Sequence, residues 1–396
     1  MKDATNMSMM EIIKDSFKKN FRQYTMLIAL VAIGTIFAIL TKGVFIFPRN
    51  LSNLFLQTVP VAIVAVGMTL IIITDNIDLS VGSVAGFTGA VAAVLQVKYQ
   101  FGPIPAIAAT LGVGLIIGAW HGFWIAYQKV PAFIVTLASM MAVRGAILGV
   151  TGGATISPMK EGFKSIGQDY LPKLFFKIPN FNDTSLIFAI IFIFLFIFFD
   201  MRKRRKRIKY GFEVLSPGLQ LVKIVCMSTA MAAVFSIMIF GEGIPYCVLL
   251  LLGIVVLFNF IANDTVFGRH LYAIGGNIDA ARLSGINTAW RVMMLYMIFG
   301  VLTSVSGIVL TARLNAATTS AGTNLELDAI AASVIGGTSL MGGEGTIFGA
   351  VVGALIMASL DNGMSIMNMD ITYQYIIKGM ILLLAVWIDI ATRKKA

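Results

Sequence analysis

The chain contains a long succession of apolar runs, and most of them are long enough to cross a lipid bilayer. A transmembrane helix needs about 17 to 25 mostly apolar residues, and such runs follow one another from residue 24 to residue 391. Hydrophobic residues make up 58% of the sequence and charged residues only 12%. One water-soluble core cannot enclose that much apolar surface. The sequence therefore predicts an all-α, polytopic helical membrane protein.

The runs predict about ten to twelve transmembrane helices, some of them short or broken, in a single transmembrane domain over residues 1–396. The first run lacks a small-residue cleavage site, so it is predicted to be an uncleaved span. Both chain ends are expected to be cytoplasmic, with an outer loop at 152–184 and an inner loop at 201–221. The predicted spans are 24–46, 53–74, 81–97, 104–127, 132–151, 185–200, 222–240, 245–261, 290–312, 326–341, 345–360 and 373–391.

The net charge of +11 comes mainly from basic clusters that adjoin apolar runs. These clusters are Lys14–Arg22, Arg202–Lys209 and Arg393–Lys395. Basic residues beside a span favour the cytoplasmic side and attract anionic lipid. The charge therefore indicates membrane lipid as a partner and gives no indication of nucleic acid.

Three predicted spans, 81–97, 326–341 and 345–360, are short and rich in glycine, alanine and serine. Broken helices survive at membrane depth only where they line a cavity, and they mark the transport pathway of many carriers. Ile77–Ser83 and Leu325–Ala331 each begin near an acid and lead into small residues. They are either a pair of half-helices or two unrelated turns. The pathway reading assigns the lining to Asn76, Asp78, Ser80, Ser83, Glu326, Asp328 and Ser333.

Ionisable residues at membrane depth tend to face water, a partner charge or a substrate. Arg144 interrupts an apolar span, and two readings stay open for it: an ion pair with Asp78, Glu326 or Asp328, or contact with substrate. Asp361 and Asn362 follow an apolar run and are predicted at the outer mouth. They form either a contact surface for a ligand or docking protein, or a plain solvated loop.

Other candidate groups carry less chemistry. The aromatic stretch Trp120–Trp124 could stack on a sugar, but tryptophan at the end of a span is more often an interfacial anchor. His121 has no local partner for proton relay or metal binding. Cys226 and Cys247 lie in apolar runs without metal-ligand spacing, so they predict no redox role.

Residues 264–287 form a polar stretch between two apolar runs. It is too long for a turn and too short for a domain. Its arginines, Arg269 and Arg282, favour the cytoplasmic side. The Gly275-Gly276 turn and the small-residue helix expected after it offer a docking surface to a cytosolic partner.

The sequence carries no G-x-x-x-x-G-K-[ST] loop, nucleophile elbow or H-E-x-x-H helix. Each of these would supply a specific catalytic geometry. The chain is therefore predicted not to be an enzyme, and a membrane enzyme is the weakest hypothesis. Any ATP hydrolysis would take place in a partner.

Several of these segments carry a resemblance to a known family. Residues 268–287, 75–83 and 335–345 resemble signatures of monosaccharide ABC-importer permeases of the ribose, galactose and xylose group. Residues 130–136, 357–364 and 373–379 look most similar to the D-xylose type. The stretch 155–222 resembles an insertion of xylose-type members, with an extra span and a basic cytoplasmic loop. Its composition differs from the xylose pattern, so galactose, ribose, inositol or a nucleoside stay open as cargo.

The resemblance implies an ABC importer permease fold and a division of labour. An extracytoplasmic sugar-binding protein captures the sugar, two permease copies form the pathway in a bacterial cytoplasmic (inner) membrane, and cytoplasmic ATPase subunits bind ATP and Mg²⁺. This chain itself is expected to hold no cofactor or metal. A secondary transporter is the rival reading, but it does not explain the docking loop.

The resemblance also implies roles for residues of the 264–287 loop. Ala280, Ala281 and Gly285 match the small-residue core of a coupling helix that seats in an ATPase groove. Arg269 and Arg282 are expected at its rim, where charge-assisted contacts form.

Overall fold

The computed structural model of the chain describes residues 21–175, 178–212 and 214–393. Within them the chain is helical, and its only extended pairings are two isolated bridges. Nine of the described helices have the length and composition to span a membrane, and the described parts of the first and last helices add two shorter apolar ones. The prediction of an all-α, polytopic membrane protein is confirmed. The predicted basic residues Lys14–Lys19 and Lys394–Lys395 lie outside the described residues.

The longer helices are mostly those that the apolar runs predict. Short 3-10 or π-helical turns follow α2, α4 and α5, at Val44–Ile46, Val94–Lys98 and Phe123–Tyr127. The helices are α2 Phe21–Leu40, α3 Pro48–Ile73, α4 Val81–Ala93, α5 Pro103–Gly122, α6 Ala132–Thr151, α7 Glu161–Gln168, α8 Asp183–Lys209, α9 Pro217–Ile239, α10 Tyr246–Asp264, α11 Val266–Gly276, α12 Ile278–Leu283, α13 Thr288–Leu314, α14 Leu325–Ile335, α15 Ile347–Ile366 and α16 Ile371–Arg393.

The three helices predicted to be short do not behave alike. α4 continues through its π-helical turn to Lys98, and α14 ends after only 11 residues, so both are short as expected. The expectation that 345–360 is short is wrong, because α15 runs for 20 residues. The acid and amide that were expected to end it lie inside the helix and find side-chain partners there.

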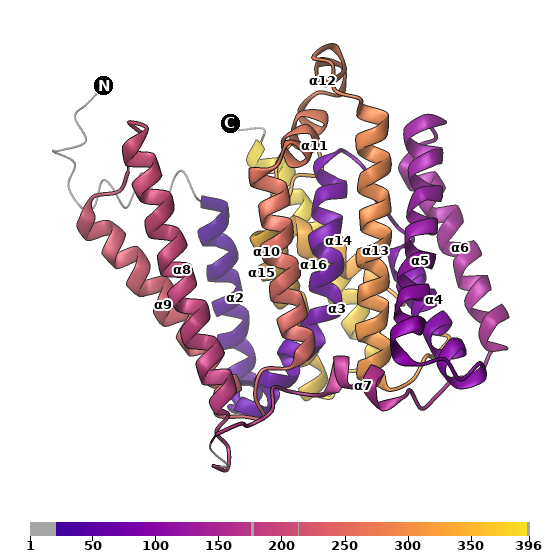
Figure 1. Ribbon diagram of the computed structural model, residues 1–396, viewed down its shortest axis with the longest axis horizontal. Coiled ribbons are helices and arrows are strands. Elements are labelled where there is room, and N and C mark those ends of the chain that lie inside the picture. The colour runs from indigo at the N-terminus through magenta and orange to yellow at the C-terminus, as the bar shows by residue number, and fades with distance from the viewer. Residues whose placement is uncertain (1–20, 176–177, 213, 394–396) are drawn as a thin grey trace.

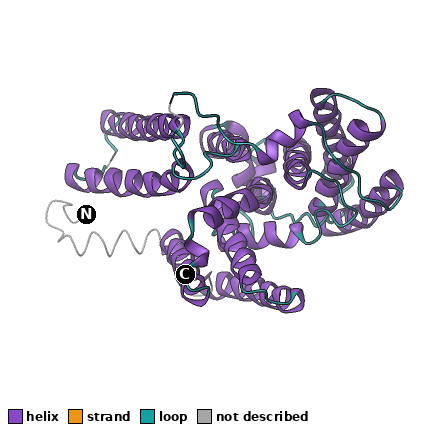
Figure 2. Ribbon diagram, turned by 90° about the horizontal axis from the view of Figure 1, so that it is seen from below, coloured by secondary structure: helices purple, strands orange, loops and turns teal. Residues whose placement is uncertain are grey.

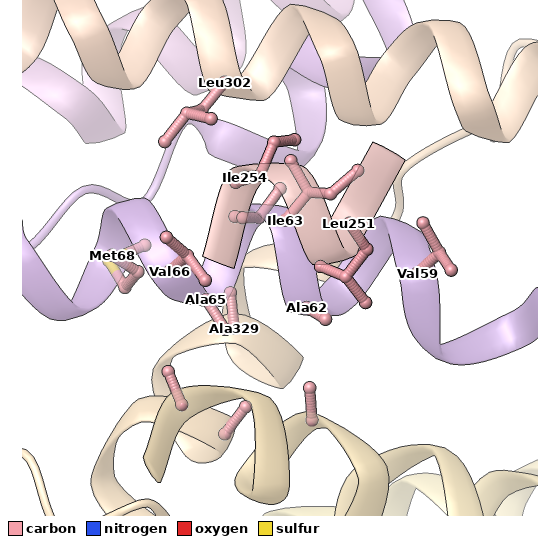
Figure 3. Close-up of a cluster of buried hydrophobic side chains, with 14 of the residues drawn as sticks. Val59, Ala62, Ile63, Ala65, Val66, Met68, Leu251, Ile254, Leu302 and Ala329 are labelled. Carbon is pink, nitrogen blue, oxygen red and sulfur yellow. The ribbon is translucent and has the colours of Figure 1, made fainter. Parts of the chain in front are cut away.

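Helix α3 occupies the centre of the bundle. Its side chains Ile63 and Val66 lie among Leu251 and Ile254 of α10, Leu302 of α13 and Ala329 of α14 (Figure 3). Its most apolar stretch is 89% buried inside the chain. This stretch meets protein on nearly every side: the short helix α14 packs on it, while the other short helix, α4, packs mainly on α13.

Two non-helical segments interrupt the bundle beside α3. Residues 74–80 connect α3 to α4, and residues 336–346 connect α14 to α15. The second segment contains Gly342 and Gly343 in the left-handed region, with φ values of 77° and 74°. A side chain at these positions would be strained, so the glycines allow the chain to bend at this depth.

The two ends of the bundle differ. Figure 1 shows α11 and α12 projecting from one end, with α7 at the opposite end. The first described turn of α2 and the last of α16 lie toward the α12 end. Helices α8 and α9 form a hairpin that stands off from the other helices in two perpendicular views (Figures 1 and 2).

Candidate functional site

The non-helical segment 74–80, which is the break before α4, is built around a buried carboxylate. Oδ1 of Asp78 accepts hydrogen bonds from the Ser80 backbone amide at 2.8 Å and from the Ser80 hydroxyl at 2.6 Å. The carboxylate also sits at the N-terminal end of α4, where backbone amides favour a negative charge. Asp78 therefore fixes the start of the short helix that the sequence predicted.

Helix α5 supplies a partner for this carboxylate. His121 Nδ1 lies 3.6 Å from Oδ2 of Asp78, and both side chains are 3% exposed. The Nε2 of His121 and the hydroxyl of Tyr296 have no hydrogen-bond partner among the described residues. Both residues line a small cavity of about 10 Å³ beside Asp78 and Thr303, which is the size of a single water site. The sequence reasoning set His121 aside because its partner lies far away in the chain.

The other residues assigned to the pathway are buried or half-buried, and Ser333 and Asn76 donate hydrogen bonds to backbone carbonyls of this chain. Ser83 and Ser333 are fully buried, and the Ser333 hydroxyl donates to the backbone carbonyls of Ala65 at 3.2 Å and Ala329 at 2.8 Å. Asn76 is half-buried and donates to the Thr74 carbonyl at 2.8 Å. Asn76 thus bonds within the segment before α4, Ser333 joins α14 to α3, and Ser83 Oγ has no hydrogen-bond partner among the described residues.

The starts of α4 and α14 lie against each other. A β-carbon placed on Gly82 of α4 would collide with the Gly322 carbonyl and with the Glu326 carboxylate. Glu326 is 9% exposed, and its Oε2 has no hydrogen-bond partner in the described part of the chain. Small residues allow such close contact between helices in a membrane. The structure thus brings the two predicted half-helices together at their N-terminal ends.

An intramembrane cation joins three helices near α14. Lys378 Nζ on α16 lies 2.6 Å from Oδ1 of Asp328 on α14 and 3.1 Å from Oδ2 of Asp361 on α15. The Lys378 side chain is 16% exposed and that of Asp328 is 12% exposed. Because such buried charges are costly without partners, this ion triad ties the short helix to its two neighbours.

Of the two readings left open for Arg144, the structure does not show the ion pair. Its Nη1 donates to the Ala321 carbonyl at 3.0 Å and lies 3.5 Å from the Thr319 carbonyl. In the described ranges no carboxylate lies within ion-pair distance of it; the partner of Asp328 is Lys378. Backbone carbonyls of the loop before α14 therefore satisfy the guanidinium in this chain.

The predicted outer-mouth residues Asp361 and Asn362 belong to α15, and the solvated-loop reading is wrong for both. Asn362 is 5% exposed and exchanges two amide hydrogen bonds with Asn50, at 2.8 and 3.0 Å. Asp361 is half-buried and joins the ion triad. Both side chains connect helices, because an unpaired amide or carboxylate would be costly at this depth.

The predicted docking loop folds into the two short helices α11 and α12. Thr265 caps α11 by accepting from the Gly268 amide at 3.2 Å, and Asn277 caps α12 by accepting from the Asp279 and Ala280 amides. At the end of α12, Ile286 N donates to the Ala281 carbonyl at 3.1 Å around Gly285, whose φ is 84°. This is a glycine-terminated helix end, so Gly285 serves the turn.

Exposure divides the predicted docking residues into two groups. Arg269, Gly276, Ala280, Arg282 and Gly285 are exposed, whereas Ala281 is 4% exposed and packs within the chain. The sequence reasoning missed Leu283, whose side chain is 89% exposed at the end of α12. An apolar side chain exposed at a projecting end is suited to contact a partner.

Helix α11 touches both breaks in the bundle. A β-carbon on Gly275 would collide with the Ile73 carbonyl at the end of α3. That carbonyl also accepts from the Gly343 amide at 2.9 Å, and the Tyr272 hydroxyl donates to the Gly345 carbonyl at 2.8 Å. Burial raises the pKa of Tyr272, so the hydroxyl stays protonated as a donor. The projecting helices are therefore attached directly to residues 73 and 343–345.

The structure offers no grounds for assigning a metal site. Among the described residues no group of three or more His, Cys, Asp or Glu side chains could hold a metal ion. The sequence reasoning missed Leu283 because a leucine is not distinguished from other apolar residues near a span. Lys378 did have a signal, as a lone lysine inside an apolar span, but its acidic partners lie on other helices.

Comparison with known proteins gives consistent matches along most of the chain. Residues 50–386 match the family described as the permease component of a branched-chain amino acid transport system. The xylose transport system permease protein XylH of Haemophilus influenzae is 45% identical over 95% of this chain and 98% of the relative. XylH of Escherichia coli K12 is 45% identical over 95% of this chain and 94% of the relative. The ribose import permease protein RbsC of Escherichia coli K12 is 37% identical over 92% of each. No solved structure matches this chain.

Proposed function

Because the chain belongs to the family of transport-system permease components, we propose that it is the transmembrane pathway subunit of an ATP-driven monosaccharide importer, with D-xylose as the first cargo to test. A 45% identity to xylose permeases over 95% of the chain supports this choice, while ribose permeases are also related.

The proposal assigns each end of the bundle to a partner. An ATPase subunit, which binds ATP and Mg²⁺, docks at the α12 end on the cytoplasmic side of a bacterial inner membrane. Both chain ends then lie on that side as well. A sugar-binding protein delivers cargo at the α7 end, and a second copy of this chain completes the pathway. Closed twofold assemblies are the commonest form for such repeated subunits.

The observation that carries the proposal is the direct attachment of α11 to both breaks. A partner that pulls on α12 moves α11, and α11 is packed against Ile73 and bonded to Gly345. These residues adjoin the segments that place α4 and α14. Motion at the docking surface can therefore reach the two short helices without passing through the long ones.

ATP binding can shift the permease only by differential affinity. The ATPase must bind one arrangement of α12 more tightly than another, and the difference in binding free energy sets the shift in population. Leu283 supplies the exposed apolar contact, with Arg269 and Arg282 at its rim. Ala281 instead holds α12 onto this chain.

The docking surface is tested by Leu283→Asp. The charge should prevent burial of this position in an ATPase groove, so co-purified ATPase and sugar uptake should both fall by at least about tenfold. Leu174→Asp is the matched control for ATPase binding and should leave the amount of co-purified ATPase unchanged, because Leu174 is 68% exposed in the segment that follows α7, at the opposite end of the bundle. If Leu283→Asp keeps full uptake and ATPase binding, the docking assignment is wrong.

The link from docking to pathway is tested at adjacent glycines. Gly275→Ala should collide with the Ile73 carbonyl and reduce uptake while the ATPase stays bound. Gly276→Ala meets no atom within 4 Å and should transport normally. Equal uptake by the two variants would contradict transmission through this contact.

The cargo is tested in vesicles that contain this chain, its ATPase and its binding protein. Labelled D-xylose should accumulate when ATP is supplied, also after the proton gradient is collapsed. Accumulation of ribose but not xylose would change the cargo and keep the importer. Uptake that needs the gradient and not ATP would instead favour a secondary transporter.

A further inference from the structure

The end of α8 concentrates positive charge beyond what the fold uses. Seven of the eight residues from Arg202 to Lys209 are arginine or lysine, and they occupy the last two turns of the helix. Six of them have exposed side chains; Arg204 is half-buried and donates to the Leu215 carbonyl at 2.9 Å. In the parts of the chain that the structure describes, none of the seven forms an ion pair.

The length of α8 places these charges at a membrane surface. The helix has 27 residues, and at about 1.5 Å per residue it is about 40 Å long. The hydrocarbon core of a bilayer is about 30 Å thick. The last turns therefore reach the level of the lipid phosphate groups on the α12 side, toward which this end of the helix points (Figure 1).

The neighbouring side chains are typical of the interface between lipid and water. Tyr210 and Phe212 directly follow the basic turns and are 70% and 62% exposed. Aromatic side chains are enriched at the headgroup level of membranes. One turn below the cluster, Asp200 is bound by Lys223 at 2.5 Å and also accepts from Gln220. Asp200 is therefore balanced by Lys223 and does not neutralise the basic residues of the cluster.

We propose that the basic end of α8 binds the phosphate groups of anionic phospholipids in the leaflet on the α12 side and anchors the α8–α9 hairpin there. Charge complementarity supports this occupant, since several cations at one height match a row of lipid phosphates. The most apolar stretches of α8 and α9 are only 11% and 17% buried inside the chain, so most of the hairpin's apolar surface is left uncovered by this chain. The hairpin also stands apart from α11 and α12, where the ATPase is proposed to dock (Figure 1). The inference needs the membrane placement of the chain and does not depend on its cargo.

The test measures lipid preference in the purified full-length protein. The protein is exchanged into micelles with equal amounts of phosphatidylglycerol and phosphatidylcholine, and the retained lipids are counted by mass spectrometry. Arg202→Gln, Arg205→Gln and Lys209→Gln together should lower the preference for phosphatidylglycerol by at least about tenfold, because each surface cation contributes measurably to anionic lipid binding. The same three positions exchanged between arginine and lysine keep the charge and should keep the preference.

A second variant controls for the place of the charges. Lys42→Gln, Lys98→Gln and Lys173→Gln remove three exposed cations elsewhere on the chain and should leave the preference unchanged. Displacement of the lipid by inorganic phosphate, but not by chloride of equal ionic strength, would show that the site takes a free anion and would overturn the lipid proposal. Wild-type lipid preference in the α8 variant would overturn it too, as would an equal loss in the control variant. Retained lipid with loss of co-purified ATPase would assign the surface to a protein partner instead.

Discussion

Helix α3 and helix α8 are both strongly apolar, yet the chain uses them in opposite ways. The most apolar stretch of α3 is 89% buried inside the chain, whereas that of α8 is 11% buried, although α8 is at least as apolar there. Beside α3, helices α5 and α13 approach each other through Gly114 and Gly300, whose α-carbons face neighbouring backbone. In the hairpin, α8 and α9 meet through the rings of Phe188, Phe192 and Phe235. In a membrane, apolar character decides that a segment is inserted, and side-chain size decides whether it packs on protein or on lipid.

The ion pairs of the two regions differ in the same way. The Lys378 triad joins three helices at a buried site. The Lys223–Asp200 pair joins only α8 to α9, and the Lys223 side chain is 44% exposed. Loss of each cation should therefore have unequal consequences.

The largest expected effect is that of Lys378→Met. The change leaves Asp328 and Asp361 without their cation, and breaking such a buried pair costs about 3–5 kcal/mol. Lys223→Met in the hairpin should cost no more than about 1 kcal/mol, as exposed pairs do. Unfolding free energies measured in one detergent would compare the two variants.

The double variant Lys378→Asp with Asp328→Lys is the control for the triad. It restores opposite charges at the same two positions. It should therefore be more stable than Lys378→Asp alone or Asp328→Lys alone. If Lys378→Met and Lys223→Met lower stability equally, the contrast between the core and the hairpin does not extend to their charges.

A smaller effect is expected at two glycines of α5. A β-carbon on Gly114 would collide with the Gly300 carbonyl and the Ser304 hydroxyl, whereas one on Gly112 meets no atom within 4 Å. Gly114→Ala should destabilise the protein by about 1–3 kcal/mol through overpacking. Gly112→Ala should be neutral or stabilising by up to about 1 kcal/mol, since alanine favours a helix. Thermal midpoints of both variants would sharpen the contrast, and a loss at Gly112 as large as at Gly114 would break it.

The smallest effect is expected from removal of the hairpin. The Leu171 amide donates to the Ile244 carbonyl at 2.9 Å, so the chain enters and leaves the hairpin at nearly the same point. Replacing residues 172–243 with a short glycine-serine linker should leave the thermal midpoint within a few degrees of the parent and preserve uptake. Failure of this variant to insert or fold would mean that the core depends on the hairpin. The unit differs from the predicted insertion 155–222, which includes α7 and divides α9.

Part of the site could be found from the sequence. Asp78 and the glycines after it predicted a short helix with a break before it. The structure has that break, because the Asp78 carboxylate accepts from the Ser80 amide at the start of α4. The 264–287 stretch predicted a polar segment with a short helix between two spans, and its residues Thr265 and Asn277 cap α11 and α12. These features depend on neighbours within a few residues, which a sequence displays directly.

The partners of buried polar groups could not be found in that way. For Arg144 an acidic partner was one of two open readings, and the guanidinium meets a backbone carbonyl instead. Asp328 meets Lys378, which is 50 positions further along the chain. His121 looked isolated until the fold placed Asp78 beside it. Each of these contacts joins two helices, and a single sequence does not state which helices are adjacent.

The sequence by itself determined that this protein is a polytopic membrane protein, where most of its helices lie, and which polar stretch separates two of its apolar helices, because hydropathy, capping and charge act over one helix at a time. The tertiary structure alone decided which apolar helix is enclosed and which faces lipid, and which charges are paired. Those outcomes depend on the fit of glycine-lined surfaces and on the distance between groups far apart in the chain. Close packing of that kind is a property of two helices together.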